Sequence, residues 1–599
     1  MIRGGDKVVE SLVGFDANGL YVGALMKPMP TEHPIRRRVE NNFKPEYIDK
    51  YGHEAHQWLE YKAFKTGKSI RHKFNGHEKA FGQGFAQIRV DGWDGKIAYQ
   101  YMGCVFHGCR VCTKNITHHP YDSTITQIQL RERTQRITDK LINEEGLKVK
   151  IKWACEWKKD KRDNPAINEF LQKNGLIKES IFRNVPTNET AILTAVKNGT
   201  LFGLVQCDIW VPEERHPEFS EMTPIFKNVE VSREDIGEHM REHCIKHTLL
   251  TQPQRTLVGS LFGKSILLIT PLLKWYMEHG LKVKNIKQVI EYKPNACFYD
   301  FGDTVTKARR QADLNPDSSI LGEAYKLLGN SAYGKTLEDL SRHREIHYVK
   351  DGGAKLINDQ FFRKLTPLDE EVDEIEMAKK AVSWYLPLQI GFFVYQYAKL
   401  RMLEFYYDCL AHFIDKSNFQ LCQMDTDSLY FVIAGKSIDD VIKPHLKQDF
   451  FSNYHLWFPS PACPKHRNEF TNTKCKNEPW SPKECCREQL QKDKRTPSLF
   501  KLEYQGDGII ALCSKTYFCF GENDIKTATK GISKTLNTLS KDTFLQVLNT
   551  QTSESGINRS FKAENGAVFT YEWLSATLSY KYIKRIVEAD GVTTRPLNI

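Results

Sequence analysis

The sequence predicts an α+β protein built from several domains. Its 599 residues are too many for one ordinary domain and correspond to about three to five. Apolar residues make up 40% of the chain, which is enough to build hydrophobic cores. Strand patterns and helical patterns are interspersed, without an internal repeat or a low-complexity tract. The strand patterns lie at 8–16, 200–215, 420–433 and 506–520, and the helical patterns lie at 318–335 and 392–413.

The composition favours a polyanionic partner without requiring one. The formal net charge is +11 and the pI is about 8.8. A mild basic excess of this kind is typical of proteins that bind nucleic acid, but many proteins that never do so share it. The charge alone therefore leaves both interpretations open.

We expect no membrane span and no export. The most apolar stretch, Ile266 to Met277, is short and is interrupted by Pro271 and Lys274. The first fifteen residues lack the long apolar core of a secretory signal, so an intracellular protein is expected. The 15 cysteines should then stay reduced, and they are candidates for metal ligation rather than for disulfides.

The first candidate catalytic residue ends the first strand pattern. The apolar run 8–16 leads to Asp16, and Tyr21 follows within Phe-Asp-Ala-Asn-Gly-Leu-Tyr. A strand that ends in a carboxylate can present that group at the edge of a sheet. A helix is expected to follow, up to the Pro-Met-Pro sequence at 28–30.

A first group of cysteines predicts a structural zinc site. Cys104, Cys109 and Cys112 lie close together, and Cys155 returns later in a Trp-Ala-Cys-Glu-Trp sequence. Four thiolates suit tetrahedral zinc. The alternative is that these cysteines are free thiols.

The helical pattern at 318–335 carries a second set of candidate residues. Lys326, Asn330 and Tyr333 are spaced to lie on one face of a helix that is expected to end at Gly334. That face offers a cation for a triphosphate, an amide and an aromatic ring. An ordinary amphipathic helix with a glycine cap would show the same spacing.

The strand–turn–strand pattern at 420–433 carries two more carboxylates. Asp425 and Asp427 flank Thr426 between apolar strand sequences. The two-residue period of an extended chain puts both carboxylates on one side, where a hairpin would present them to a cleft. The alternative is a polar turn that begins with aspartate.

A second group of cysteines lies between this hairpin and the last strand pattern. Its members are Cys463, His466, Cys475, Cys485 and Cys486. They could close another zinc site, although the spacing fits no motif that we can name. The alternative is a variable surface insertion with incidental thiols.

The order of these pieces resembles a known family. Asp-x-x-x-Leu-Tyr, Lys-x-x-x-Asn-Ser-x-Tyr-Gly and Asp-Thr-Asp-Ser resemble motifs A, B and C of B-family DNA polymerases. Lys515-Thr516-Tyr517 then resembles the Lys-x-Tyr element that the family uses at the primer terminus. The subgroup most similar is the protein-primed one of viruses, linear plasmids and self-synthesising transposons. The resemblance implies a right-handed fold with an antiparallel palm sheet and its helices, helical fingers and a thumb.

The resemblance also implies roles, partners and cofactors. Asp16 and Asp427 would be the main ligands of two Mg²⁺ ions, with Asp425 assisting. The partners would be a DNA primer-template, deoxynucleoside triphosphates and a terminal priming protein. The site of action would be the nucleus or a site of viral or transposon replication. The nucleotide pocket would contain Tyr21 under the sugar, Lys326 and Arg309 or Arg310 on the triphosphate, and Asn330 and Tyr333, while Lys515 and Tyr517 would steady the primer.

Several features depart from the family pattern. Gly19, Val22 and Gln423 replace residues that members often carry, and none of them removes a metal ligand. Only 15 residues precede Asp16, which leaves no room for the usual exonuclease domain. We therefore expect a fragment, a truncated gene product or a decayed element.

The segment around the first cysteine group resembles the very-short-patch repair endonucleases. Val-Asp-Gly-Trp at 90–93, Gly-Cys-Val-Phe-His at 103–107 and Trp-Ala-Cys-Glu at 153–156 are similar to their motifs. The resemblance implies that Asp91 binds a catalytic metal, that His107 positions water and that Glu78 supplies a further carboxylate. Gln100 stands where glutamate is usual. A zinc-stapled DNA-binding fold without cleavage activity is the alternative.

The expected product is thus a DNA-directed DNA polymerase interrupted by an α/β endonuclease-like, zinc-containing domain. A metal-dependent endonuclease and an inactive DNA-binding relic are the alternatives. The predicted division is 1–40 palm with motif A, 41–190 inserted domain, 191–285 palm and terminal-protein-like region, 286–345 fingers, 346–440 palm with motif C, 441–500 cysteine-containing insertion, and 501–599 palm end and thumb.

Overall fold

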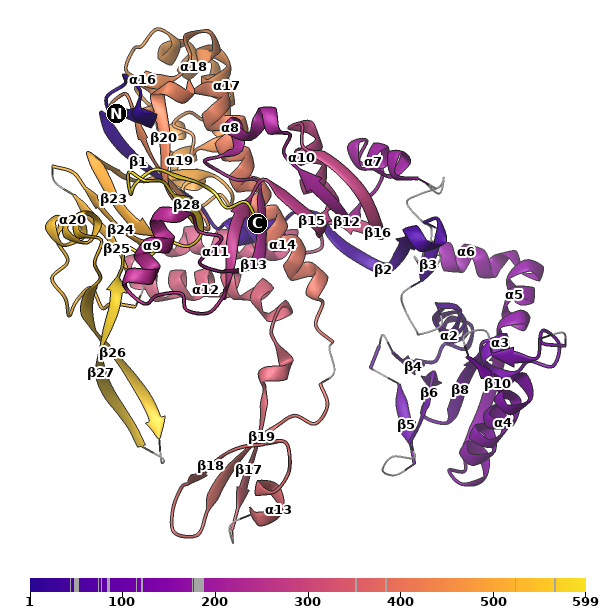
Figure 1. Cartoon of the computed structure of the whole chain (residues 1–599). Coiled ribbons are helices and arrows are strands. Elements are labelled where there is room, and N and C mark those ends of the chain that lie inside the picture. Colours follow the sequence, from indigo (N-terminus) through magenta and orange to yellow (C-terminus); the bar gives the residue numbers. More distant parts are fainter. Residues whose placement is uncertain are drawn as a thin grey trace.

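The computed structural model describes residues 1–599 apart from 44, 48–52, 74, 77, 83–86, 115, 120–121, 175, 177–187, 351–352, 383–384, 523, 530 and 565–566. Helices and strands are mixed along the whole chain (Figure 1), which confirms the expected mixture of α and β structure. Among the described residues, no helix is both long and apolar enough to cross a membrane.

A four-stranded antiparallel sheet joins the first strand of the chain to strands that lie far away in the sequence. The strand order is β20-β21-β1-β22, so the first strand lies between strands from the last third of the sequence. Every residue of β21 is buried, because the sheet is covered at this strand. The strands are β1 (Ser11–Ala17), β20 (Phe419–Asp425), β21 (Ser428–Ile433) and β22 (Phe500–Gly506), as the strand patterns at 8–16 and 420–433 predict.

Aromatic side chains pack one face of this sheet against a long helix. Helix α14 (Leu388–Glu404) continues into a π-helical turn, Phe405–Leu410, within the expected helical segment. The Phe405 ring stacks on Phe500 at 3.7 Å between centroids and lies 5.8 Å from Phe15. Burial of these rings supplies much of the apolar contact that holds the helix on the sheet.

A second sheet of five strands lies beside the first. Its order is β15-β12-β16-β2-β3, and an ion pair between the buried side chains of Arg37 and Glu291, 2.9 Å long, joins β2 to β16. Because both charges are out of water, each depends on the other for its solvation. The strands are β2 (Met29–Arg38), β3 (Pro45–Tyr47), β12 (Gly203–Trp210), β15 (Phe262–Ile269) and β16 (Lys282–Asn295).

Three helices pack together near the C-terminal end of β1. They are α1 (Leu20–Leu25), α11 (Tyr299–Ala312) and α12 (Ser319–Thr336). Gly329 of α12 lies against Val22 of α1 and Val305 of α11, and a β-carbon added to it would come within 2.8 Å of Val22. The helix does not end at Gly334 as predicted, since that residue is helical and Thr336 is the last helical residue.

The segment 53–173 forms an α/β unit, drawn at the right of Figure 1. We call it the inserted unit, because it lies in the sequence between β3 and β12, which both belong to the five-stranded sheet. Its sheet has the order β11-β8-β7-β4, with a parallel pair formed by β8 and β11. Trp58, Tyr99 and Trp157 form its core with neighbouring apolar residues. Its main elements are α2 (His53–Thr66), β4 (Arg71–His72), β7 (Gly92–Trp93), β8 (Ile97–Met102), α4 (Gln127–Asn143), β11 (Lys148–Trp153), α5 (Ala154–Asp163) and α6 (Pro165–Lys173).

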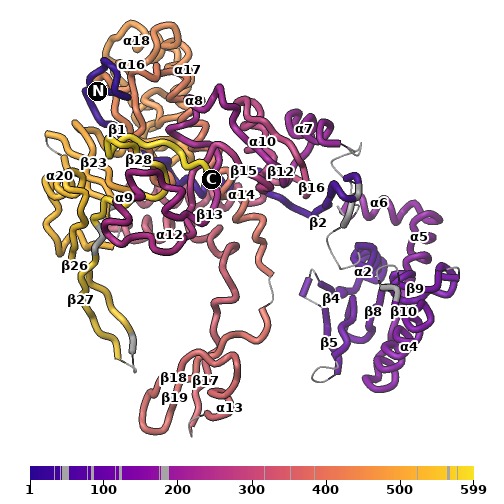
Figure 2. Tube along the Cα trace, in the orientation of Figure 1, coloured from indigo at the N-terminus to yellow at the C-terminus, as the bar shows by residue number. Residues whose placement is uncertain are grey.

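Two further parts project from the body of the molecule, as the chain trace in Figure 2 shows. One is a three-stranded sheet of β17 (Arg344–Val349), β18 (Phe362–Pro367) and β19 (Asp373–Ala378). The other is a two-stranded ribbon of β26 (Glu554–Glu564) and β27 (Ala567–Leu578). The strand pattern expected at 506–520 is present as β23 (Gly508–Cys513) and β24 (Thr516–Phe520).

The close contact at Gly329 gives a test of the helix packing. We expect Gly329→Ala to lower the free energy of unfolding by roughly 1–3 kcal/mol, because the added methyl group overpacks the Val22 contact. Gly334→Ala is the matched control, since nothing lies within 4 Å of its added β-carbon and alanine favours a helix. Thermal melting of both variants measures the effect, and equal melting temperatures would contradict it.

Candidate active site and metal centres

Three carboxylates come together at one end of the four-stranded sheet. Asp16 is next to last in β1, Asp425 ends β20, and Asp427 lies in the turn before β21. The turn is tight, because the Asp427 N–H donates to the Asp425 carbonyl at 2.6 Å and Thr426 has a left-handed φ of 54°. The Ala17 N–H donates to the Asp427 carbonyl at 2.8 Å, which fixes the turn beside Asp16.

Burial and mutual repulsion disfavour ionisation of these groups. The pKa of Asp427 is raised to about 6, first by burial and then by the negative charge of Asp16. Burial also raises the pKa of Asp16, against the attraction of Lys501. A carboxyl group whose pKa is raised by a nearby carboxylate is typical of a site built to hold a cation.

Two lysines form ion pairs with the carboxylates of this site. Lys501 Nζ lies 3.2 Å from Asp16 Oδ2, and Lys515 Nζ lies 3.0 Å from Asp425 Oδ1. Among the described residues, the three aspartates are not one of the groups whose ligand atoms converge within 4.8 Å. Each lysine thus offsets the charge of a different aspartate.

The sequence analysis missed Lys501 and its neighbour Glu503. Lys501 is paired with Asp16 across β1 and β22, and Glu503 accepts a hydrogen bond from the Tyr430 hydroxyl at 3.1 Å. Lys526 balances Glu503 at 2.8 Å. The alternation of opposite charges on a strand at 501 and 503 is the signal that could have found them.

Three tyrosine rings pack together next to the carboxylates. Two of them, Tyr21 and Tyr333, belong to the motifs that contain Asp16 and Lys326. The Tyr21 and Tyr333 rings stack with centroids 4.4 Å apart, and Tyr395 meets both edge-on. Burial raises the pKa of Tyr21 and of Tyr333, and the charge of Asp427 adds to the shift of both. The sequence analysis missed Tyr395, which comes from the long helix α14.

The lysine, the arginines and the asparagine that are expected at the nucleotide have different surroundings. Lys326 and Asn330 lie exposed on α12, and Lys326 Nζ is 3.2 Å from Glu323. Arg309 is half-buried on α11. Arg310 instead donates hydrogen bonds to the Lys492 carbonyl and to Thr496 Oγ1, at 3.0 and 2.9 Å. Of the two arginines, Arg310 therefore belongs to the contact with segment 492–499.

The two residues expected at the primer also differ. Lys515 sits in the turn between β23 and β24 with a left-handed φ of 67° and reaches Asp425. Tyr517 is buried, and its ring packs 5.1 Å from that of Tyr430. Lys515 is therefore exposed, whereas the Tyr517 ring is part of the packing around Tyr430.

The first cysteine group converges as the zinc prediction requires. Ligand atoms of Cys104, Cys109, Cys112 and Cys155 all lie within 4.8 Å of one another. Cys104 opens the short helix α3 (Cys104–His107), and Cys155 lies at the start of α5. Four sulfur atoms at this spacing could hold a tetrahedral zinc ion.

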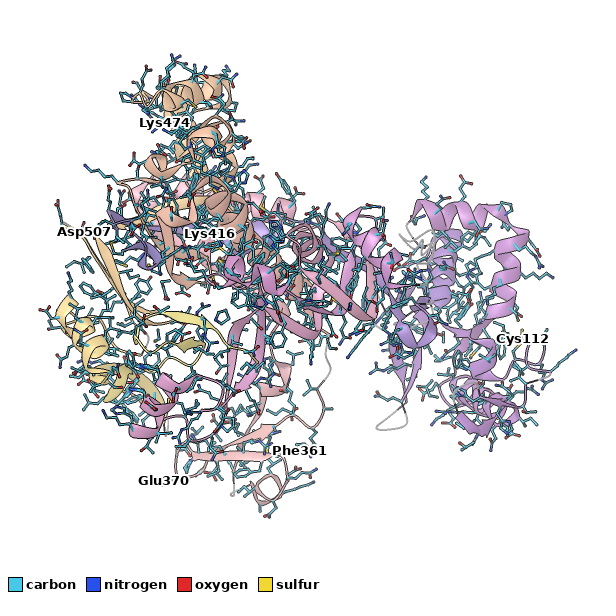
Figure 3. All side chains as sticks on the ribbon, turned by 45° about the horizontal axis from the view of Figure 1, so that its top comes forward. Cys112, Phe361, Glu370, Lys416, Lys474 and Asp507 are labelled. Carbon is cyan, nitrogen blue, oxygen red and sulfur yellow. The ribbon has the colours of Figure 1, made fainter. Side chains whose placement is uncertain are left out.

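A second group converges in a different part of the molecule. Cys463, His466, Cys485 and Cys486 also have ligand atoms within 4.8 Å of one another. Cys475 is outside the group, and its Sγ lies 3.2 Å from Gln448 Oε1. Figure 3 marks Cys112 on the inserted unit and Lys474 next to Cys475, on opposite sides of the molecule.

The residues expected to form a nuclease site are only partly together. The pKa of Asp91 is raised to about 7, mainly by burial and in smaller part by the charge of Glu78. Asp91 accepts a hydrogen bond from the Tyr101 N–H at 2.6 Å. His107 ends α3 and lies against α4, with Nδ1 3.3 Å from Thr134 Oγ1. The charge of Glu78 thus acts on Asp91, and His107 has a separate partner.

A third convergent group in the inserted unit was not expected. His56, Glu60 and His72 meet within 4.8 Å, and His72 Nε2 lies 2.7 Å from Glu60 Oε1. Hydrogen bonds from both histidines lower the pKa of Glu60 to about 2. The period of four between His56 and Glu60 on a helix was the available signal.

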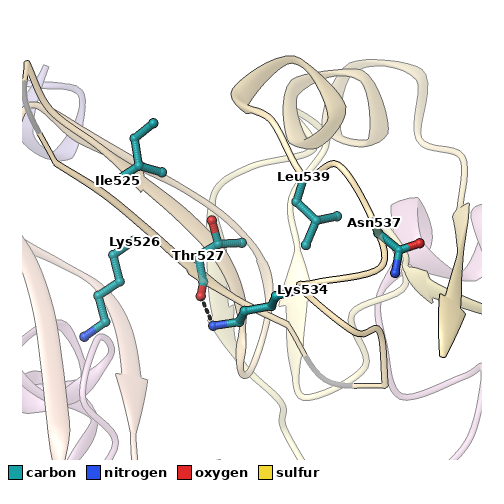
Figure 4. A pocket seen from close by; sticks show the side chains of 6 residues that line it. All are labelled: Ile525, Lys526, Thr527, Lys534, Asn537 and Leu539. Atoms are coloured by element: carbon teal, nitrogen blue, oxygen red, sulfur yellow. Dashed lines mark hydrogen bonds between the residues drawn. The ribbon is translucent and has the colours of Figure 1, made fainter. Parts of the chain in front are cut away.

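A surface pocket lies between β25 (Ile525–Ala528) and the chain before α20 (Lys541–Thr550), and Lys526, which lines it, also pairs with Glu503. Figure 4 shows Lys534 donating a hydrogen bond to the Thr527 carbonyl across it. No carboxylate lines it, so we assign the candidate chemistry to the aspartates at the sheet end.

Comparison with known proteins gives limited likeness. No protein-family model matches this chain, and no curated protein matches it. Three solved structures that resemble it are Phi29 DNA polymerase in an orthorhombic crystal form, in a post-translocation binary complex with primer-template DNA, and in a complex with single-stranded DNA. The respective identities are 12%, 11% and 13%, and the TM-scores are 0.34, 0.32 and 0.30.

The matches cover 63%, 77% and 62% of this chain and 51%, 73% and 50% of those chains. The chain therefore spans about half the length of the first of these structures. Likeness at this level establishes neither the family nor the activity of this chain.

The raised pKa of Asp427 predicts a pH-dependent cost to stability. A carboxyl group with a raised folded-state pKa stabilises the fold below its unfolded-state pKa and loses that contribution as pH rises through about 6. In metal-free buffer, Asp427→Asn should therefore be more stable than the wild type at about pH 7.5, by roughly 1–2 kcal/mol. The gain should shrink towards about pH 4. Melting curves across this range measure it, and a loss of stability at every pH would refute it.

Proposed function

We propose that this chain is a DNA-directed DNA polymerase that adds deoxynucleotides to a primer 3′-hydroxyl and releases pyrophosphate. The observation that carries the proposal is the position of Asp16 on β1 beside Asp427 in the turn before β21, next to the stacked rings of Tyr21 and Tyr333. The order of the four sequence motifs supports it independently.

The donor set of the site fits two magnesium ions. Asp16 and Asp427 would hold them with help from Asp425, and carboxylate oxygens are the ligands that magnesium prefers. The mutual repulsion that raises the pKa of Asp427 is what a bound cation would relieve. When bound, such ions offset the charge that develops on the attacking and leaving oxygens.

The side chains around the carboxylates would position the substrates. Tyr21 would lie under the sugar, supported by Tyr333, and the size of its ring would exclude a 2′-hydroxyl. Lys326 and Arg309 would contact the triphosphate from α12 and α11, and Asn330 would line the same pocket. Lys515 would release Asp425 and turn to the primer strand. A DNA primer-template and deoxynucleoside triphosphates are the substrates, and a terminal priming protein is a further proposed partner.

Primer extension tests the proposal. With Mg²⁺ and four deoxynucleotides, the wild type should extend a labelled primer, and Asp427→Ala should lower the rate by roughly a thousandfold or more. Asp6→Ala is the control, because it removes an exposed aspartate remote from the sheet end. Binding of primer-template, measured by fluorescence anisotropy, should be similar in all three proteins. Extension that survives in Asp427→Ala would overturn the proposed site.

A metal-dependent endonuclease is the second candidate function. The observation that favours it is Asp91, whose pKa is raised to about 7 by burial and in smaller part by the charge of Glu78, in the α/β unit that also holds the first cysteine group. Carboxylates whose charges act on one another can bind a divalent ion. Retention of this unit as a zinc-stapled DNA-binding fold is the competing interpretation.

Nicking of a supercoiled plasmid separates the two functions. If the inserted unit cleaves DNA, Asp91→Asn should abolish nicking in Mg²⁺ or Mn²⁺, because the ion loses a charged ligand. Asp427→Ala should leave nicking unchanged. Asp163→Asn is the control, an exposed aspartate in the same unit. Absence of nicking in the wild type would reject the endonuclease.

A further inference from the structure

The second cysteine group has the geometry of a closed tetrahedral metal site. Three sulfur atoms surround His466 Nδ1, with Cys463 at 3.2 Å and Cys485 and Cys486 both at 3.5 Å. Cys463 Sγ lies 3.6 Å from Cys485 Sγ and 3.8 Å from Cys486 Sγ. Zinc–sulfur bonds of about 2.3 Å in a tetrahedron put the sulfur atoms about 3.8 Å apart.

Hydrogen bonding alone does not account for this arrangement. The imidazole Nδ1 has one lone pair, so it cannot accept hydrogen bonds from three thiols at once. The sulfur atoms are also too far apart for disulfides, whose S–S bond is about 2.05 Å. The Cys463 N–H points to Cys486 Sγ at 3.5 Å, a contact that suits a thiolate bound to metal.

The four ligands tie together two distant points of one segment. Cys463 precedes the turn η11 (Pro464–His466), which ends at His466, and Cys485 and Cys486 lie in the first turn of α19 (Glu484–Asp493). Between them lies α18 (Arg467–Cys475), whose Phe470 packs on Trp480. Phe470 also packs on Phe451 and Tyr454, and Lys483 pairs with Glu469 at 3.1 Å. An ion held by the four ligands would add a direct link between the two ends of this segment.

The chain that leaves α19 supports the candidate active site. We call residues 492–499 the strap. Arg310 of α11 donates to the Lys492 carbonyl and to Thr496, and Arg495 pairs with Asp313 at 2.6 Å. At its far end, the Ser498 N–H donates to the Asn18 carbonyl at 2.7 Å.

A second backbone hydrogen bond joins the strap to Asn18, this time with Asn18 as the donor. The Asn18 N–H donates to the Leu499 carbonyl at 2.8 Å, two residues after Asp16. The strap therefore joins α11 to the chain that carries Asp16. Its upstream end is set by α19, and α19 begins at the cysteine pair.

We propose that one zinc ion, held by Cys463, His466, Cys485 and Cys486, fixes α19 and thereby holds the strap between α11 and Asn18. All four positions of the ion are taken by protein ligands, so its role is structural. This site is independent of the Cys104–Cys155 group and of the polymerase proposal. Only the link from the strap to a catalytic role of Asp16 rests on the proposed function.

Metal content of the full chain tests the site. We expect Cys485→Ser to contain about one zinc fewer per chain than the wild type after dialysis against a competing chelator. Cys485 is exposed, so its loss should disturb packing least. Cys475→Ser is the matched control, a cysteine of the same segment that lies outside the group, and it should match the wild type. Equal zinc in Cys485→Ser and the wild type would overturn the proposal.

Cobalt spectroscopy keeps the test decisive if Cys485→Ser folds poorly. Cys112→Ser weakens the first cysteine group, and Co²⁺ added to that variant should give the visible absorption of tetrahedral thiolate coordination. The absorption should be absent when Cys463→Ser is added. Cobalt absorption that persists in the double variant would place the metal elsewhere.

Hydrogen exchange tests the strap. In the Cys112→Ser background, chelation should raise amide exchange in 492–499 and in α11 by about tenfold or more, with little change in β12 and β16. Unchanged exchange in the strap after zinc loss would reject the link between the metal and the active site, whether or not the chain polymerises DNA. Loss of DNA synthesis with intact zinc and an intact strap would count against the polymerase alone.

Discussion

The arrangement of the candidate site depends on two carboxylates held close together against their own repulsion. Asp16 and Asp427 lie on adjacent segments that the Ala17–Asp427 backbone hydrogen bond fixes, and burial weakens their hydration. Backbone hydrogen bonds and apolar packing of β1 and β21 must supply the energy that this repulsion costs. Neighbouring carboxyl groups in a half-buried position, one of them with a raised pKa, are typical of a functional site that binds cations.

The surrounding helices are positioned by contacts that leave little tolerance. Gly329 lets α12 approach α1 closely enough for the Tyr333 ring to stack on Tyr21. The strap then fixes α11 to the segment after Asp16 through Arg310 and Ser498. The carboxylates, the tyrosine rings and the arginines of α11 are therefore linked by packing and hydrogen bonds, although they come from separate stretches of the chain: β1 with α1, α11, α12, α14 and the turn between β20 and β21.

Two groups of candidate metal ligands lie in different parts of the fold. The Cys104–Cys155 group lies in the inserted unit, where it connects α3 to α5, and the Cys463–Cys486 group lies beside the strap. The first group joins three cysteines that are close in sequence to Cys155, and the second joins Cys463 and His466 to the adjacent Cys485 and Cys486. Each group brings together segments that are apart in the sequence, so a bound ion would cross-link them.

The sequence by itself determined the residues that carry the candidate chemistry and the type of element around them. Strand and helix periods predicted β1, β20, β21 and α12, and carboxylates at strand ends identified Asp16, Asp425 and Asp427. Only the tertiary structure decided the partners of these groups. It places Lys501 and Glu503 beside Asp16, and Tyr395 beside Tyr21. It also shows that Arg310 donates a hydrogen bond to Lys492, 182 residues away, and that Cys475 lies outside the second group of candidate metal ligands. The reason is that side-chain periods report local geometry, whereas pairing across strands and helices depends on how distant segments pack, and one sequence contains no direct record of that packing.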